Sequence, residues 1–461
     1  MFRVVSAQRV LLIAMPLLAF IPRSWIAAHM LYGSDQPVFD IGFGFGGYIR
    51  ELLQSGTFRS CSFLPFQPCH PGICTSSTRM PFLPLLLAGL AAVVGTKSLF
   101  VALARCGVAV VLSTGFLAFL TVDVELTWFG VALVYALYFG PQALKHGATL
   151  DYEEGLFIDL SLCLAIAICY LLRPDLTQSA WRRAFMALAA VALSVIMYLT
   201  KTTALLMLLV VLLLVMTRGV GRPVKLACLL IVALPVGAWL AHNLRSSGVA
   251  TASSSWNGEN LFRGYNNESY ELYPQIHLDR IFDSRLAILD DGRSVALGAH
   301  KSDRCFNDEW TWNQTYGQMA RRWLVDHPGT ALAFAARKLW VTLFEVRHTP
   351  VYDSATDKRV DGARFLRVLM LVWMVIARLP FFLLLAFVYR DLRAGRNPSY
   401  GWAALLLAAG CAPYVLVFSY ERHVIPILQM AAVMLAVLYF RKTPGLSRSD
   451  RKLPAFHGGA I

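Results

Sequence analysis

The sequence predicts an all-α polytopic membrane protein of about ten transmembrane helices, with interfacial helices in its first and its largest outer loops. Three observations support this fold class. Hydrophobic residues make up 57% of the 461 residues, and the mean hydropathy is +0.55. Charged residues make up only 15%, against about 25% in soluble domains. Several apolar runs reach the roughly 20 residues that a helix needs to cross a bilayer.

The net charge of +14 does not indicate a nucleic-acid partner. Most basic residues lie in short loops between apolar runs and in the tail, where positive charge marks the cytoplasmic side. The first hydrophobic segment follows Arg3 and Arg9 and lacks a small-residue cleavage site. We therefore interpret it as a retained anchor and not as a cleaved signal peptide.

The positive-inside rule also sets the topology. The predicted spans are 9–29, 98–120, 126–142, 156–172, 184–200, 203–217, 224–242, 365–389, 400–418 and 423–440. The apolar run 81–95 is short and opens with prolines, and we expect it not to cross, since a crossing would turn the basic loops 173–183 and 217–225 outward. The weak point is the loop 121–125, which is predicted inside but has no basic residue.

This count gives one transmembrane domain, residues 1–440, and a basic cytoplasmic tail, residues 441–461. The outer loops are 30–97 and 243–362. Within the second loop, the stretch 328–345 is predicted to be an interfacial helix with Arg337 and Lys338 at headgroup level. The sequence has no internal repeat and no coiled-coil pattern.

The first outer loop contains two acids, Asp35 and Asp40, followed by four glycines and two phenylalanines. Residues 47–56 then predict a short amphipathic helix that ends at Gly56. An acid held just outside a membrane helix can act as a general base. The alternative is that the two acids cap this helix or are simply solvated.

Four of the nine cysteines, Cys61, Cys69, Cys74 and Cys305, fall in the outer loops. In an oxidising compartment they can form two disulfides in any of three pairings. A metal site of Cys69, His70 and Cys74 is the alternative, although the spacing matches no standard zinc pattern. The remaining cysteines lie in apolar runs and are predicted to be core residues.

Charged and polar residues from five separate segments gather at the predicted outer face. They are Asp35, Asp40, Arg79, Lys145, His146, Asp151, Glu153, Glu154, Lys201, Asn243, Arg245, Glu421, Arg422 and His423. Arginine and lysine hold phosphate, and a carboxylate can move a proton. The pattern predicts a site for an anionic ligand that enters from the lipid. Each residue also has a simpler interpretation, such as snorkelling of Lys201 or a helix-dipole role for Glu153 and Glu154.

The order of these motifs resembles the polyprenyl-phosphate-sugar-dependent membrane glycosyltransferases of the GT-C fold, the class that includes the aminoarabinose transferases for lipid A and the protein O-mannosyltransferases. The resemblance covers about residues 10–440, and each motif is short. The matching residues are Asp40, Tyr48 and 56–58; Arg79, Pro81 and Pro84; Asp151, Glu153 and Glu154; Thr200 and Lys201; Trp239, His242 and Asn243; and Arg422 with Pro426.

Two departures bear on the site. The usual acid pair is a single Asp40 followed by Ile41, so Asp35 is an alternative base. The usual arginine of the seventh-span motif is His242, which leaves Arg245 as a substitute. The chain is also shorter than many relatives and lacks their added outer domain.

The resemblance implies transfer of a sugar from a polyprenyl-phosphate-linked donor to a lipid, glycan or protein acceptor. The size of the chain and its basic tail indicate the cell inner membrane, and the positive-inside topology puts the active site on the periplasmic side. The resemblance assigns the catalytic acids and the residues that bind the donor phosphate. The catalytic candidates are Asp40, as general base, with Asp35, Asp151 and Glu153, and the phosphate-binding candidates are Arg79, Lys201, Arg245 and Arg422. No cofactor is predicted, and the question of a divalent metal stays open.

Two other classes of protein fit the composition. A transporter or lipid-linked-saccharide flippase would also be a basic protein of ten spans, but such folds often have internal repeats and charges near the bilayer midplane. Here the charges cluster at one face and no repeat is found, which favours the enzyme. A non-catalytic assembly subunit is the third alternative.

Overall fold

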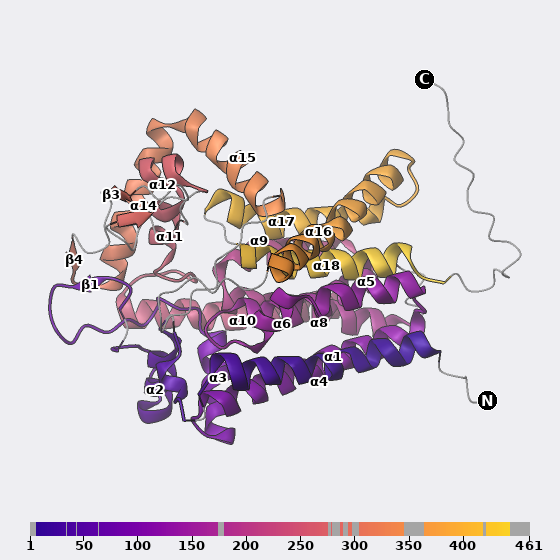
Figure 1. Ribbon diagram of the computed structural model, residues 1–461, viewed down its shortest axis with the longest axis horizontal. Coiled ribbons are helices and arrows are strands. Elements are labelled where there is room, and N and C mark those ends of the chain that lie inside the picture. Colours follow the sequence, from indigo (N-terminus) through magenta and orange to yellow (C-terminus); the bar gives the residue numbers. More distant parts are fainter. Residues whose placement is uncertain are drawn as a thin grey trace, which may run out of the picture.

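The computed structural model is built almost entirely of helices (Figure 1). It describes residues 6–33, 35–42, 44–62, 64–173, 179–274, 278, 286–288, 294–296, 304–344, 364–417 and 421–442. The helices are α1 (Ala7–Ile26), α2 (Phe45–Ser55), α3 (Phe82–Val94), α4 (Ser98–Asp123), α5 (Trp128–Tyr138), α6 (Pro141–Ala148), α7 (Glu154–Leu172), α8 (Ala180–Thr200), α9 (Leu205–Thr217), α10 (Arg222–Ser247), α11 (Asn257–Gly264), α12 (Asn267–Leu272), α14 (Glu309–Asp326), α15 (Pro328–Phe344), α16 (Arg364–Arg393), α17 (Gly401–Leu416) and α18 (Glu421–Tyr439). Two short strand pairs join β1 (Gln67–Pro68) to β4 (Cys305–Phe306) and β2 (Leu286–Ile288) to β3 (Ser294–Ala296).

The prediction of an all-α polytopic membrane protein is confirmed. Within the described ranges, seven helices are long and apolar enough to cross a membrane: Ala7–Leu31, Ser98–Asp123, Glu154–Leu172, Ala180–Thr200, Arg222–Ser247, Pro398–Leu416 and Arg422–Tyr439. Shorter apolar helices lie at two more predicted spans, Trp128–Tyr138 and Thr202–Thr217. Helix α16, 30 residues long, covers the remaining one.

Helix α7 forms the centre of the bundle. All 19 of its residues are buried, and it packs against α18, α8, α4 and α6. Its sequence is apolar on every side, which is the pattern of a helix surrounded by others. Helix α10 is the opposite case, with leucines such as Leu226, Leu230 and Leu234 on its exposed side. In a membrane such leucines face lipid, so α10 lies at the edge of the bundle.

The segments predicted inside meet at one end of the bundle. The guanidinium of Arg182 contacts the carboxylate of Asp123, and the ammonium of Lys442 contacts Glu125. The backbone N–H of Lys442 also donates to the carbonyl of Glu125 at 2.7 Å. The loop 121–125 has no basic residue of its own, but neighbouring segments supply basic residues that contact its acids.

The run 81–95 does not cross the bundle. Helix α3 has only 13 residues, about 20 Å in length. The loop before it reaches the segment between α6 and α7, where the N–H of Gly42 donates to Asp151 at 2.8 Å and Arg79 pairs with Glu153 at 3.3 Å. A crossing at α3 would put these two segments at opposite ends. In Figure 1, α2, α11 and α14 accordingly gather at the end away from the N-terminus.

The amphipathic helix of the first loop is also confirmed. It is α2, which ends at Gly56 with φ +68°, a conformation that favours glycine. Its N-cap is Gly44, so neither Asp35 nor Asp40 caps it. Both acids are exposed, at 84% and 57% of the side chain.

Two disulfides form in the outer loops, Cys61–Cys74 and Cys69–Cys305. This selects one of the three pairings and excludes a metal site of Cys69, His70 and Cys74. The second disulfide joins β1 to β4 across 236 residues. Throughout the described part of the chain, no group of three or more His, Cys, Asp and Glu residues is placed to hold a metal.

The expectation that Lys338 lies at headgroup level is wrong. Helix α15 forms as predicted, but the Lys338 side chain is fully buried. Its ammonium donates to the carbonyls of Val417 at 2.9 Å and Gly264 at 3.3 Å, and lies 3.7 Å from the ring centre of Tyr265. These carbonyls end helices α17 and α11, where a cation is favoured by the helix dipole. Lys338 therefore docks α15 onto two other helices.

Candidate functional site

Residues 149–154, the loop between α6 and α7 with the first residue of α7, bring three acids to the end of the bundle away from the N-terminus. Asp151 accepts hydrogen bonds from the N–H of Gly42 at 2.8 Å and from the hydroxyl of Thr149 at 3.3 Å. The backbone N–H of Leu150 donates to the hydroxyl of Tyr32, at the end of α1. Segments far apart in the sequence thus fix this loop in place.

The last acid of this loop, Glu154, is the centre of a group that we call the Glu154 cluster: Glu154, Lys201, Arg422 and His423. Its buried carboxylate lies 2.5 Å from the Lys201 ammonium, 3.1 Å from Nε2 of His423 and 3.7 Å from Nε of Arg422. Burial would lower the pKa of Lys201, but the charges of Glu154, Tyr414 and Glu153 and the hydrogen bond to Glu154 together outweigh burial and raise the pKa. Lys201 is therefore a fixed cation.

Arg79 adds a third cation beside this cluster. It pairs with Glu153 at 3.3 Å, and its guanidinium lies 4.1 Å from the ring centre of Trp256 and 4.6 Å from that of Phe45. Burial lowers the pKa of Arg79, and the neighbouring Glu153 opposes that shift. Two aromatic faces and one carboxylate thus hold the guanidinium in a single orientation.

The residues before Arg79 form a buried turn, residues 75–78, that we call the TSST loop. The hydroxyl of Tyr48 lies 2.8 Å from the hydroxyl of Thr78 and accepts from its N–H at 3.2 Å. The hydroxyl of Ser77 donates to Asn243 of α10 at 2.7 Å. The TSST loop is therefore a rigid support for Arg79.

The sequence-predicted site residues divide into two groups. Arg79, Asp151, Glu153, Lys201 and Arg422 come together around the loop 149–154. The other three, Asp40, Asp35 and Arg245, have different contacts or exposed positions.

Asp40 is the nearest of these three along the chain, two residues before the Gly42 that binds Asp151, and its carboxylate pairs with Arg50 at 3.7 Å. Asp35 pairs with Lys97 at 2.8 Å on the surface. Arg245 lies exposed in the last turn of α10. The structure joins neither Asp35 nor Arg245 to the Glu154 cluster.

Sequence reasoning underrated Glu154 and His423 and missed Glu309. The role of Glu154 could have been expected, because it begins a helix whose every other residue is buried. A buried carboxylate needs cations nearby. Glu309 gave no such signal, since it follows an acid in a polar loop. Its partners are serines more than 50 residues away, which no local pattern indicates.

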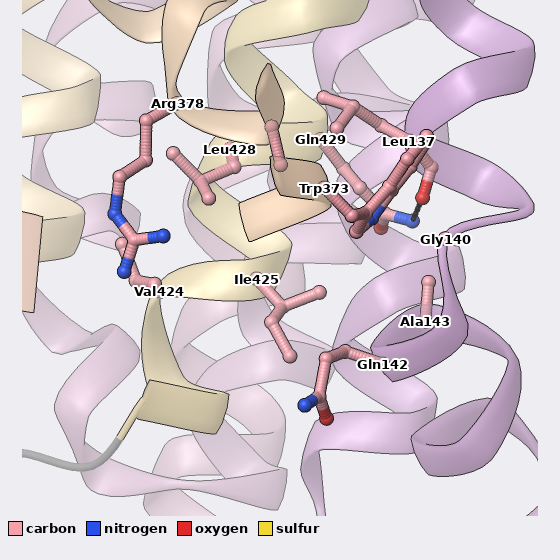
Figure 2. A pocket seen from close by; sticks show the side chains of 11 residues that line it. Leu137, Gly140, Gln142, Ala143, Trp373, Arg378, Val424, Ile425, Leu428 and Gln429 are labelled. Carbon is pink, nitrogen blue, oxygen red and sulfur yellow. Dashed lines mark hydrogen bonds between the residues drawn. The ribbon is translucent and has the colours of Figure 1, made fainter. Parts of the chain in front are cut away.

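An apolar pocket of about 40 Å³ lies between helices α16 and α18 (Figure 2). Helices α16 and α18 contribute most of its lining, and α5, α6 and the turn between them contribute the rest. The lining includes Trp373, Ala377 and Arg378 of α16 and Val424, Ile425 and Leu428 of α18. A second, smaller pocket of about 10 Å³ is lined by His423 of the Glu154 cluster, together with Thr203 and Tyr414.

The charges around the loop 149–154 balance: Lys201, Arg422 and Arg79 supply three positive charges, and its three acids supply three negative charges (3 − 3 = 0). Within the Glu154 cluster alone, Lys201 and Arg422 exceed the single charge of Glu154 by one (2 − 1 = 1). An anion with one negative charge would complete the balance, and arginine and lysine are suited to phosphate oxygens.

Comparison with known proteins gives one structural likeness. No family model matches the chain, and no curated protein matches its sequence. The fold is similar to the crystal structure of ArnT from Cupriavidus metallidurans bound to undecaprenyl phosphate, with a TM-score of 0.40 and 13% sequence identity. The match covers 94% of this chain and 60% of that one. A likeness of this size identifies neither a family nor an activity.

Proposed function

We propose that this protein is a membrane glycosyltransferase that moves a sugar from a polyprenyl-phosphate-linked donor to a lipid, glycan or protein acceptor. It would act in the cell inner membrane, on the periplasmic side. The observation that carries the proposal is the Glu154 cluster with Arg79: three cations that carboxylates hold close together at one end of the bundle.

The donor's phosphate would bind Lys201, Arg422 and Arg79. Glu153 and Glu154 already hold these cations in fixed positions, so little reorganisation would accompany binding. The apolar polyprenyl chain would leave the phosphate toward the pocket between α16 and α18. Arg245, which is exposed and lies two residues after Asn243, would be a further contact for the phosphate or the sugar.

The reaction would be a direct displacement. Asp40, whose carboxylate is largely exposed, accepts a proton from the acceptor hydroxyl as its oxygen bonds to the anomeric carbon. The bond from that carbon to the phosphate oxygen breaks, and polyprenyl phosphate leaves. The cations stabilise its charge. Asp151 is the second candidate base, while Glu153 is committed to Arg79 and Asp35 to Lys97.

The test uses the purified protein in lipid nanodiscs with a labelled polyprenyl-phosphate sugar. Wild type is expected to release polyprenyl phosphate, and Lys201→Met is expected to slow this release by about a hundredfold or more, because it removes a charged contact to the leaving group. Lys97→Met is the matched control, since this lysine lies on the same surface but pairs with Asp35 away from the cluster. Equal loss in both variants, or no release by wild type, would contradict the proposal.

One observation favours a transporter as the second candidate. Arg23 of α1 and Asp159 of α7 form a buried ion pair at 2.9 Å within two spans, and Tyr138 donates to the same carboxylate at 2.7 Å. Ion pairs inside spans often mark transport pathways. Movement of a labelled lipid-linked sugar across proteoliposomes without release of polyprenyl phosphate would support this alternative.

A further inference from the structure

Glu309, the first residue of α14, is a buried carboxylate that binds only uncharged donors in the described part of the chain. It accepts from the N–H of Ser76 at 2.9 Å, from the hydroxyl of Ser76 at 3.1 Å and from the N–H of Ser77 at 3.1 Å. Its other oxygen accepts from the hydroxyl of Ser255 at 2.8 Å and again from Ser77. Its residue is only 4% exposed.

Such an arrangement is costly unless the donors are fixed. Burial raises the pKa of Glu309, and the hydrogen bonds from Ser76, Ser77 and Ser255 oppose this shift. Each hydrogen bond to the carboxylate offsets part of the loss of hydration, so the donors together stabilise the charge only while all of them stay in place. The carboxylate and its serines therefore stabilise one another as a unit.

This unit reaches Arg79 from two directions. Ser76 and Ser77 belong to the TSST loop, which continues through Thr78 and leads directly to Arg79. Ser255 precedes Trp256, the ring that lies 4.1 Å from the Arg79 guanidinium. The N–H of Ser255 also donates to the carbonyl of Ser77 at 2.8 Å. One carboxylate thus holds both the backbone that carries Arg79 and the aromatic surface on which Arg79 lies.

The disulfide Cys69–Cys305 joins the same two parts of the chain. Cys305 lies four residues before Glu309, and Cys69 lies seven residues before Ser76. The start of α14 is therefore tied to the TSST segment by a covalent bond as well as by the carboxylate. The second outer loop is thus built into the support of the candidate phosphate site.

We propose that Glu309 is a positioning residue that sets the Arg79 guanidinium at the phosphate site. The part concerning phosphate rests on the proposed function, whereas the part concerning Arg79 does not. Removing the negative charge would loosen Ser76 and Ser77 of the TSST loop and Ser255 beside Trp256, and Arg79 would be held less firmly in its single orientation. The affinity for the phosphate of a polyprenyl lipid would then fall, although Glu309 itself touches no ligand.

The test compares Glu309→Gln and Glu309→Asp with Asp308→Ala in the full-length protein in nanodiscs. Asp308 is the matched control, because it caps α14 by accepting from the N–H groups of Trp310 and Thr311 but does not touch the TSST loop. Two quantities are measured: the Kd for undecaprenyl phosphate, and the rate at which phenylglyoxal modifies Arg79, followed by mass spectrometry.

We expect Glu309→Gln to raise the Kd by about tenfold, the effect of losing one charged hydrogen-bonding unit, and to speed modification of Arg79. Glu309→Asp should recover part of both, and Asp308→Ala should change neither even where it lowers the melting temperature. Unchanged Kd and unchanged Arg79 reactivity in Glu309→Gln would overturn the proposal.

Two further outcomes keep the test decisive. If Glu309→Gln does not fold, Ser255→Ala removes one donor and is expected to shift both quantities in the same direction by a smaller factor, and no shift would overturn the proposal. If wild type does not bind undecaprenyl phosphate, the proposed function fails, and the reactivity of Arg79 still decides the role of Glu309.

Discussion

Glu154 occupies the position where a negative charge is most needed when no ligand is bound. Its carboxylate contacts Lys201, Arg422 and His423 at the start of α7. Without it, two cations would repel each other in a buried site, and a buried ion pair that loses one partner costs about 3–5 kcal/mol. Glu154 therefore maintains the geometry that a phosphate would use.

Glu154→Gln tests this role. We expect a lower melting temperature than wild type, because Lys201 and Arg422 lose their shared counter-charge. Undecaprenyl phosphate should raise the melting temperature more in the variant than in wild type, because its phosphate replaces the missing negative charge. Thermal unfolding with and without this lipid measures both effects. An equal shift in the two proteins would mean that the phosphate binds elsewhere.

Asp40 is the sharpest assignment at the residue scale. Asp40→Asn should abolish sugar transfer by removing the proton acceptor, while membrane insertion and the melting temperature stay near wild type, because the exposed carboxylate has only a long contact to Arg50. Asp35→Asn is the control and should leave transfer intact. If sugar transfer by Asp40→Asn stays near the wild-type rate, the general base would be Asp151 instead. Asp151→Asn is therefore assayed in parallel.

Among the elements, α15 depends on a lysine whose charge state is set by burial. Desolvation lowers the pKa of Lys338 to about 7, well below the 10.5 of an exposed lysine. Between these values the unfolded chain binds more protons than the folded one, so the stability contributed at this position rises with pH. The penalty for burying the charge is largest below about pH 7 and is relieved toward pH 10.

Lys338→Met makes this visible. The variant has no titrating group at this position. The free energy of unfolding of wild type relative to the variant should therefore rise by up to about 1 kcal/mol per pH unit as the pH increases from 7 to 10, and the relative melting temperature should rise with it. Parallel melting curves over that range provide the measurement. A difference that stays constant with pH would show that Lys338 keeps its charge throughout the range.

The sequence predicted the elements better than their partners. The apolar runs located the seven helices that are long enough to cross a membrane, and a run of 13 residues opened by prolines identified α3 as too short, because length and hydropathy are local properties. Lys338 was misplaced because the same periodic pattern describes a helix lying on headgroups and one packed under α17. Only the carbonyl of Val417, 79 residues away, distinguishes the two.

The candidate site shows the same limit. Arg79, Lys201 and Arg422 were identified from residue type and position near span ends, and the structure brings them together. The acids that hold them, and the link from Glu309 to the TSST loop, follow from contacts across 47 to 268 residues. Such pairings depend on how the helices assemble and leave no periodic trace in one sequence.

At the scale of the whole molecule, the fold separates its charges between two ends. The basic loops predicted inside meet near Asp123 and Glu125, and the acidic loop 149–154 meets its cations at the other end. In Figure 1 the second outer loop, with α11 and α14, stands over this second end. A bundle organised in this way carries its charged candidate site at one of its two ends.

The most direct measurement is a cryo-EM structure of the protein with a non-hydrolysable polyprenyl-phosphate sugar bound in nanodiscs. The account predicts the phosphate within hydrogen-bond distance of Lys201 and Arg422, and the anomeric carbon on the side that faces Asp40. A phosphate bound away from these cations, or a carboxylate of Asp40 on the far side of the bilayer from them, would contradict it.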